Sequence, residues 1–335
     1  MSQNWARQTT VRAIRPALNV LDRRIERLAR RRAREVVDSS RAVRGLRSDG
    51  RQLREDLAQV RAELEGMRER VRQSEYAVDL LLGPHGRRNS RLVSEEKLRE
   101  LAAQVHAVTR VPDAYERVVQ AYRTLFELEL RGVGRLAGTP RNILGKLVTT
   151  PLLNPPNGEI LEIGTLFGLF SGGMVRQISR VGLPYRLTVI DPLASVQLQA
   201  GALRADTSGS PVTETVVREN LALAGVDPER LRIVRGFSED PQVQAQAADR
   251  QYGVVVIDGD HSAEGVASDL AYAEKIVAPG GIVVLDDYGS SSWPGVQEAS
   301  ERHLAGPTRF ELVGVVLTSA FLRARVEHEV AGGAL

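Results

Sequence analysis

The amino-acid sequence predicts an α/β protein with a doubly wound parallel sheet, preceded by a long helical region. Two observations predict the sheet. From residue 158 onward, short apolar runs alternate with stretches of helical length, and a glycine-containing turn follows the first run. One observation predicts the helical region, because apolar residues recur at spacings of three and four between residues 53 and 71.

Residues 1–82 are expected to form an arginine-rich helical or coiled-coil region. Its heptad seam consists of Leu53, Leu57, Val60, Leu64, Met67 and Val71. Gly45 and Gly50 weaken a helix, so a break is expected near residues 39–50. The seam fits a coiled coil that joins copies of the chain into a homo-oligomer. It fits equally a helix that folds back on its own domain.

Residues 83–157 are expected to form a linker followed by helices that lead into the sheet domain, residues 158–335. The linker is rich in glycine, proline and serine. Helices are expected from Ser94, from Pro112, and over a short stretch at 142–147. Strands are expected at 159–163, 186–190, 231–235, 253–257 and 281–285, helices at 169–181, 212–224, 263–277 and 294–304, and a hairpin at 310–316 and 318–323.

Composition excludes several classes of site. The chain has 335 residues, 42% of them hydrophobic, and no cysteine, so disulfides, cysteine-zinc sites and thiol nucleophiles are excluded. The net charge of +3 hides an asymmetry: residues 1–110 hold about 25 Lys/Arg against about 15 Asp/Glu. A solvated helix explains this basic arm better than nucleic acid, since aromatic residues are scarce there. No long apolar run predicts secretion or membrane spanning, so a cytoplasmic location is expected.

The stretch 159–168, EILEIGTLFG, predicts a strand, a tight turn and a helix start. Gly164 and Gly168 allow close backbone approach to a ligand, with Thr165 between them and Glu162 at the strand end. The G-x-x-x-G spacing differs from the fingerprint of dinucleotide binders. We interpret this turn as a pocket for a nucleotide-type cofactor, although any parallel α/β domain can carry such a turn.

Two later strand ends add to this pocket. Asp191 ends the second strand, where a carboxylate of a doubly wound sheet accepts the ribose hydroxyls, although capping of a turn before a proline is an alternative. After the third strand come Gly236, Phe237 and Ser238, where an adenine would lie. Phe237 is placed to cover the base and Ser238 to bond its edge.

Carboxylates gather after the fourth and fifth strands. Asp258, Asp260 and His261 follow the fourth, and Asp286 and Asp287 follow the fifth. Four carboxylates at one sheet edge repel each other unless a cation or protons compensate. An all-oxygen set suits a hard divalent ion such as magnesium. The alternative is that His261 caps the helix expected at 263.

The patterns E-x-G-T-x-x-G and IDGDH…LDDY resemble those of class I S-adenosylmethionine-dependent O-methyltransferases. They are most similar to the metal-dependent sugar O-methyltransferases of macrolide and aminocoumarin pathways and to cephalosporin-pathway relatives. The resemblance covers residues 110–330 and implies a Rossmann-like, seven-stranded methyltransferase sheet with lid helices before it. It also implies an S-adenosylmethionine site formed by Glu162, Gly164, Thr165, Gly168, Asp191, Gly236, Phe237, Ser238 and Asp258.

The same resemblance assigns chemistry to the acidic residues. It implies a magnesium site at Asp258, Asp286 and Asp287, and a general base at either Asp260 or His261. The expected reaction is methyl transfer to a hydroxyl of a sugar or a small glycosylated or secondary metabolite. The alternatives are a metal-independent enzyme that uses His261, and a non-catalytic coiled-coil interaction protein. Nucleic-acid methylation is not expected, because no Asn/Asp-Pro-Pro-Tyr motif follows the fourth strand.

Overall fold

A computed structural model describes residues 20–34, 52–68, 93–134, 136–194, 198 and 211–326. The chain divides into two compact units, residues 1–92 and 93–335, and each is described by itself. The predicted helix break near 39–50 and most of the linker, 83–92, lie outside the described residues. Within the described ranges, no helix combines the length and apolar character needed to cross a membrane.

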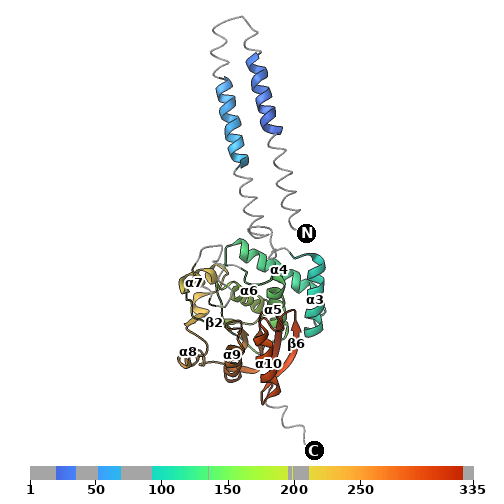
Figure 1. Ribbon diagram of the computed structural model, residues 1–335, viewed down its shortest axis with the longest axis vertical. Helices are drawn as coiled ribbons and strands as arrows, with labels where there is room; N and C mark the ends of the chain where they lie inside the picture. Colours follow the sequence, from blue (N-terminus) through green and yellow to red (C-terminus); the bar gives the residue numbers. More distant parts are fainter. Residues whose placement is uncertain are drawn as a thin grey trace, which may run out of the picture. The chain divides into compact units, whose positions relative to one another are not determined.

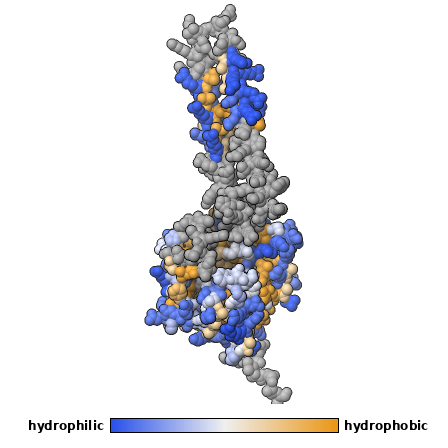
Figure 2. Space-filling view, viewed as in Figure 1, coloured by the Kyte–Doolittle hydropathy of each residue, from blue (hydrophilic) through white to orange (hydrophobic). Residues whose placement is uncertain are grey.

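The first unit contains two helical segments, residues 20–34 and 52–68. They lie side by side in Figure 1, and Arg32 and Asp56 form an ion pair of 2.7 Å between them. Hydrophobic side chains follow the line along which the two helices face each other (Figure 2). The pairing covers only part of this seam, because Leu57 stays 40% exposed and Leu28 58% exposed.

The second unit contains a seven-stranded sheet of order β3-β2-β1-β4-β5-β7-β6. Its first five strands are parallel, and β7 is antiparallel to both β5 and β6. The strands are β1 Gly158–Ile163, β2 Tyr185–Asp191, β3 Leu231–Arg235, β4 Tyr252–Ile257, β5 Val277–Leu285, β6 Phe310–Val316 and β7 Ser319–Ala324. The predicted fold class, including the terminal hairpin, is confirmed.

Helices cover both faces of the sheet because successive strand residues point to opposite sides. In β4, Val254 and Val256 belong to one core cluster, and Val255 and Ile257 to the other. The first face packs against α3 Glu95–Thr109, α4 Ala114–Leu130, α5 Pro140–Leu152, α6 Leu169–Arg180 and α7 Glu214–Leu223. The second packs against α8 Pro241–Ala247, α9 Ala263–Ile276 and α10 Pro294–Ala305. Figure 1 shows these layers.

Three elements illustrate where the structure differs from the prediction. Helix α5 spans Pro140–Leu152 instead of 142–147, because Thr139 caps its start and its residues are almost all buried. Helix α8 was not predicted, since seven residues are too few to show a helical period. Strand β5 begins at Val277, where the chain leaves α9 in an extended conformation and pairs at once with Tyr252.

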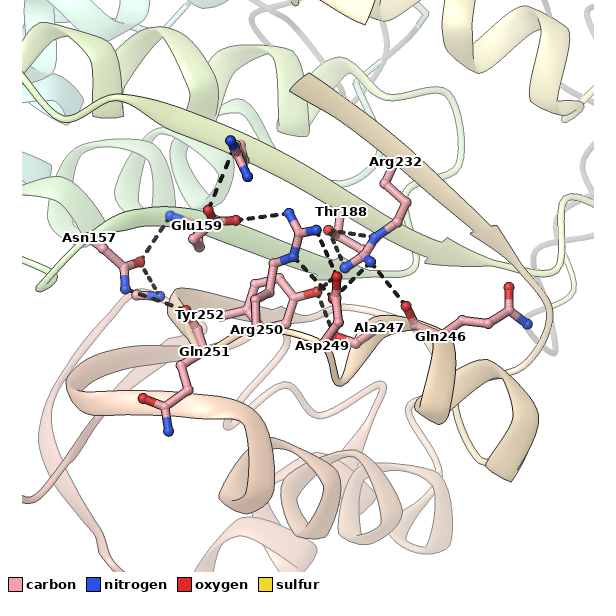
Figure 3. A network of polar contacts seen from close by, with 12 residues as sticks. Asn157, Glu159, Thr188, Arg232, Gln246, Ala247, Asp249, Arg250, Gln251 and Tyr252 are labelled. Carbon is pink, nitrogen blue, oxygen red and sulfur yellow. Dashed lines mark hydrogen bonds and ion pairs between the residues drawn. The ribbon is translucent and has the colours of Figure 1, made fainter. Parts of the chain in front are cut away.

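A polar network ties the amino ends of β1, β3 and β4 together (Figure 3). Arg232 of β3 donates hydrogen bonds to Tyr252 of β4 and to Asp249, both at 2.8 Å. Arg250 pairs with Asp249 at 2.9 Å and with Glu159 of β1 at 3.3 Å. The hydrogen bond from Arg250, with help from Arg232, holds the pKa of Asp249 below its usual range. The carboxyl edge of the sheet, at the other end of the strands, is left for ligands.

Candidate active site

The turn between β1 and α6 depends on its glycines. Gly164 has a φ of +82°, and its N–H donates to the carbonyl of Ile190 at 2.9 Å. A Cβ at this position would lie 2.3 Å from the carbonyl oxygen of Asp258, so no side chain fits. Gly168, also at +82°, precedes the first residue of α6. The turn therefore passes close to the neighbouring strand ends, as the sequence predicts.

Asp191 at the end of β2 holds this turn in place. Its Oδ2 accepts hydrogen bonds from the N–H groups of Thr165 at 2.8 Å and Leu166 at 3.2 Å. Its Oδ1 accepts from the N–H of Leu193 at 2.8 Å. The structure thus brings Asp191 and Thr165 together through the backbone of the turn. Ribose binding by Asp191 stays a prediction.

Glu162 lies at the end of β1 and is buried. Burial raises the pKa of its carboxyl to about 7, although the hydrogen bond that Ser171 Oγ donates to it acts in the opposite direction. Ser171 lies in the first turn of α6. The carboxyl is therefore fixed against the helix start and titrates near neutral pH.

A cavity of about 410 Å³ opens at this edge of the sheet. Its size is in the range of small-molecule sites. The predicted cofactor residues that line it are Glu162, Gly164, Thr165, Asp191, Gly236, Phe237, Ser238 and Asp258. Phe237 and Leu198 also face it and are each 53% exposed. Two large apolar side chains open to solvent beside a polar turn suit a ligand with an aromatic base and a polar tail.

The register of the sheet places two predicted acidic residues side by side. Ile257 of β4 pairs with Leu285 of β5, and the next residues are Asp258 and Asp286. Their backbone N–H groups continue the ladder, since Asp258 donates to Ile163 at 2.9 Å and Asp286 to Ile257 at 3.1 Å. Their carboxylates therefore meet at the carboxyl edge, as predicted.

Lys146 of α5 lies between these two carboxylates. Its Nζ is 3.0 Å from Asp258 Oδ2 and 2.6 Å from Asp286 Oδ2, and its side chain is 2% exposed. Asn142, one helical turn earlier, donates from Nδ2 to Asp286 Oδ1 at 2.7 Å. Burial lowers the pKa of Lys146. The charges of Asp258 and Asp286 together raise it by more than burial lowers it, so the pKa lies above its ordinary value. The ammonium group stays charged.

The two carboxyls of this cluster respond in opposite directions. Burial and the charge of Asp286 raise the pKa of Asp258 well above its usual value. For Asp286, burial acts upward, but Lys146 and the hydrogen bond with Asp258 hold its pKa below the ordinary value. Asp286 is therefore the carboxylate that most firmly keeps its charge beside the ammonium group.

His261 lies on the other side of the acidic residues. Its Nε2 is 3.3 Å from Asp287 Oδ2 and 3.8 Å from Asp258 Oδ1. Its Nδ1 is 3.1 Å from the carbonyl of Gly259, and its ring packs against Trp293 with centroids 4.9 Å apart. Burial lowers the pKa of His261, but the hydrogen bond with Asp287 and the nearby carboxylate charges raise it overall.

Asp260, the other predicted base, is placed differently. Its Oδ1 accepts from the N–H of Ser262 at 2.9 Å, and its Oδ2 accepts from the hydroxyl of Ser262 at 2.7 Å. Ser262 in turn caps α9. Asp260 lines the cavity, but both its oxygens already serve the turn that leads into this helix. Both ring nitrogens of His261 face oxygen acceptors, and Asp260 but not His261 is among the residues that line the cavity, so the choice of base between these two residues stays a prediction.

The predicted magnesium ligands come together, but they do not fit a metal as they are arranged. Asp258 and Asp286 each face the ammonium of Lys146, and Asp287 faces His261. In the part of the chain that the structure describes, no group of three or more histidine, aspartate or glutamate side chains is arranged to hold a metal ion. Magnesium stays a prediction that this arrangement does not favour.

Sequence reasoning missed three residues of the site, namely Lys146, Asn142 and Ser319. The hydroxyl of Ser319 donates to Asn142 Oδ1 at 3.0 Å and lies 3.4 Å from Asp286 Oδ1. One signal was available: a lysine in the otherwise apolar run ILGKLV, four residues after an asparagine. Two polar groups at this spacing share one helix face.

A family model described as a methyltransferase domain matches residues 161–288. This segment holds the glycine turn, Asp191 and the acidic residues described above. The matched segment lies within the second unit and is similar to methyltransferase domains. The methyltransferase predicted from the sequence motifs is thereby confirmed. Among curated proteins, none matches the chain.

Solved structures of methyltransferases resemble part of this chain. The O-methyltransferase NovP is 23% identical, covers 50% of this chain and 72% of its own, with a TM-score of 0.41. TomG from Streptomyces achromogenes, solved with S-adenosylmethionine, is 20% identical over 70% and 92%, with a TM-score of 0.39. The TDP-rhamnose 3'-O-methyltransferase of calicheamicin biosynthesis is 18% identical over 68% and 93%, with a TM-score of 0.38. At these sequence identities and TM-scores the likenesses support no conclusion about function, which is therefore inferred from the residues of this chain.

Proposed function

We propose that the methyltransferase domain transfers a methyl group from S-adenosylmethionine to a hydroxyl oxygen. The observation that carries this proposal is the cavity of about 410 Å³ beside the glycine turn, with the imidazole of His261 held by two carboxylates at the same sheet edge. Glycine turns of this kind let backbone approach a nucleotide-type ligand. S-adenosylmethionine, when bound, supplies an electrophilic methyl group.

Different residues of the chain would bind different parts of the cofactor. The turn at Gly164 and Gly168 would receive the polar tail of the cofactor, and Asp191 would fix this turn while facing the ribose. Phe237 would cover the adenine. The ring of Phe237 is exposed and otherwise contacts solvent. Gly236 and Ser238 would complete the adenine end of the site. These placements rest on the sequence resemblance and, for every one of these residues except Gly168, on the cavity lining.

His261 is the general base of this proposal. The acceptor hydroxyl gives its proton to the pair formed by His261 Nε2 and Asp287 Oδ2, 3.3 Å apart, while its oxygen bonds to the methyl carbon and the bond from that carbon to the cofactor's sulfur breaks, which releases S-adenosylhomocysteine. Asp287 and Asp258 orient the imidazole and stabilise its protonated form at 3.3 and 3.8 Å. Proton removal of this kind contributes roughly 10²- to 10⁴-fold to a rate.

The metal-assisted form implied by the sequence resemblance would use Asp258, Asp286 and Asp287 as magnesium ligands. Because protein donors face these carboxylates, the proposed reaction contains no step through a metal. The proposed acceptor is a hydroxyl of a sugar or of a small glycosylated or secondary metabolite. This choice of acceptor rests on the resemblance of the IDGDH…LDDY pattern alone.

A transfer assay tests this function. The full chain is incubated with S-adenosylmethionine carrying a labelled methyl group and with a panel of nucleotide sugars, glycosides and catechols. We expect label on an oxygen of one acceptor class, with S-adenosylhomocysteine formed in equal amount. Label on nitrogen, or on the protein alone, would contradict an O-methyltransferase.

We also propose that the helices of the first unit join copies of the chain. Parts of their apolar seam remain exposed in a single chain, including Leu28 and Leu57. Apolar heptad positions left open to water favour packing against another helix. Such self-association is compatible with catalysis in the second unit.

A further inference from the structure

The acidic cluster already contains a cation from the chain itself. Lys146 Nζ is within 3.0 Å of carboxylate oxygens from the ends of both β4 and β5, and its side chain is 2% exposed. The ring of Phe170 lies on another side, with its centroid 4.7 Å from Nζ. This ammonium group is therefore enclosed by two carboxylates and an aromatic face, all of which favour positive charge.

We infer that Lys146 takes the place of a divalent cation in this site and positions Asp258 and Asp286, so that magnesium neither binds there nor supports turnover. The catalytic part of this inference rests on the proposed function. Lys146 acts as a positioning residue: it holds Asp258, and Asp258 faces Nε2 of His261. The structural part, that the cluster excludes magnesium, stands independently of methyl transfer.

Charge and geometry both oppose a metal at this position. Magnesium requires near-octahedral oxygen ligands at about 2.0–2.1 Å and keeps several waters. A lysine ammonium at 2.6 and 3.0 Å instead occupies the space between Asp258 and Asp286 at hydrogen-bond distance. A metal ion would have to displace this buried charge. Asp286 is further fixed on its other oxygen by Asn142 at 2.7 Å.

Helix α5 is built to deliver this lysine. Thr139 caps the helix by accepting from Asn142 N, and Pro140 follows at its first position. Asn142 and Lys146 are four residues apart and therefore face the same strand ends. Lys146 lies before residue 161, outside the segment that matches the methyltransferase-domain model. The cation is thus contributed by the helix that precedes the domain, not by its acidic motifs.

Removal of the lysine should turn the cluster into a metal site. Lys146→Ala leaves two partly buried carboxylates without their cation and opens space between them. Lys146→Met removes the charge but fills the space. The full chain and both variants are melted with and without millimolar MgCl₂. We expect no magnesium shift for the unsubstituted chain, and a melting temperature for Lys146→Ala lowered by about 10 °C.

Magnesium should restore most of that loss in Lys146→Ala. It should not do so in Lys146→Met or in a Lys146→Ala/Asp286→Asn double variant, which lacks one of the two carboxylates. Restoration in the first variant alone supports the inference. A magnesium shift of the unsubstituted chain that Asp286→Asn abolishes would overturn it, as would equal behaviour of Lys146→Ala and Lys146→Met in magnesium.

Two binding measurements complete the test. If Lys146→Ala does not fold, MgCl₂ is titrated by calorimetry into the unsubstituted chain and into Asp286→Asn. Binding heat in the unsubstituted chain that is absent in Asp286→Asn would overturn the inference. No binding heat in either protein would support it. S-adenosylmethionine binding without magnesium is measured on the same unsubstituted protein. Absent cofactor binding with the expected melting pattern would reject the proposed function and keep the lysine assignment. Cofactor binding with a magnesium shift would do the reverse.

Discussion

At the scale of single residues, the side chains of the site differ in the hydrogen bonds and ion pairs that they already make within the chain. Both carboxylate oxygens of Asp260 accept hydrogen bonds from Ser262, whereas Nε2 of His261 faces Asp287 and Asp258. An imidazole held by carboxylates has a fixed orientation and a stabilised protonated form. The sequence alone leaves these two adjacent residues as equal candidates for the base, and the proposed function takes His261.

Substitution of these two neighbours should therefore have unequal effects. His261→Asn should lower the turnover number roughly 10²- to 10⁴-fold, because the proton acceptor is lost. Asp260→Asn should change it by less than about tenfold, since the amide oxygen can still accept from Ser262. Turnover is measured as S-adenosylhomocysteine formation, and cofactor affinity serves as the control for folding. A larger loss in Asp260→Asn would assign the base to Asp260.

A second residue-scale effect concerns Asp269 on α9. It is 1% exposed, and neither of its carboxylate oxygens has a hydrogen-bond partner of normal geometry among the described residues. Burial raises its pKa from 3.8 to about 7, although a contact with the Ser238 side chain lowers it, and Glu239 and Asp260 add smaller upward contributions. The folded chain therefore keeps a proton that the unfolded chain releases at a much lower pH.

Stability should consequently fall as pH rises from about 4 to about 7. The folded state binds more protons than the unfolded state throughout this window, and the loss is complete above the folded pKa. Asp269→Asn should remove this contribution and stabilise the chain above pH 7 by up to about 4 kcal/mol. Urea unfolding of both proteins across this pH range measures it. Parallel stability curves would show that Asp269 is not protonated in the folded chain.

At the scale of elements, the strands and long helices could be predicted because their periods are visible in the sequence. Strand β3 was predicted at its observed bounds, 231–235, and α9 within one residue. The cation of the site could not be predicted, because it depends on how α5 packs against strand ends more than 100 residues later. The sequence showed only that a compensating positive charge was needed, and magnesium was the expected source.

The glycine turn permits an element-scale test with a matched control. Gly164 and Gly182 have φ values of +82° and +83°, but only Gly164 has backbone atoms within van der Waals range of a new Cβ, at 2.3 Å. Gly182→Ala should cost about 1–2 kcal/mol from backbone conformation alone. Gly164→Ala should cost about 1–3 kcal/mol more, because the Asp258 backbone must move.

Cofactor affinity should separate the two glycine variants further. Gly164→Ala should lose S-adenosylmethionine binding, because the turn lines the cavity. Gly182→Ala should keep it, since this turn lies between α6 and β2 at the amino end of the strand. Unfolding in urea and calorimetric titration give the two readouts. Equal effects in both variants would argue against a close-packed turn at the cofactor site.

At the scale of the whole molecule, the chain joins a helical unit to a methyltransferase domain. The helical unit shows two paired helices whose apolar seam is partly exposed, and the second unit shows a cavity whose lining includes members of an acidic cluster. The sequence predicted the seam from its spacing, but spacing does not distinguish pairing within one chain from pairing between chains. Both need the same apolar positions.

Self-association through the first unit is tested by charge on the seam. A Leu28→Glu/Leu57→Glu double variant should have a lower molar mass in light scattering than the unsubstituted chain at the same concentration. Leu223→Glu, at a leucine of α7 that is 51% exposed, is the control and should leave the mass unchanged. A monomeric unsubstituted chain at all concentrations would contradict the proposal.

We propose a cofactor site that is complete without a metal ion. Calorimetric titration of S-adenosylmethionine into the full chain in the presence of EDTA tests it most directly. We predict micromolar binding in EDTA, no further gain on adding magnesium, and loss of binding in Asp191→Ala, because that carboxylate fixes the turn at Thr165 and Leu166. Binding that appears only after magnesium is added, or no binding in either buffer, would contradict the account.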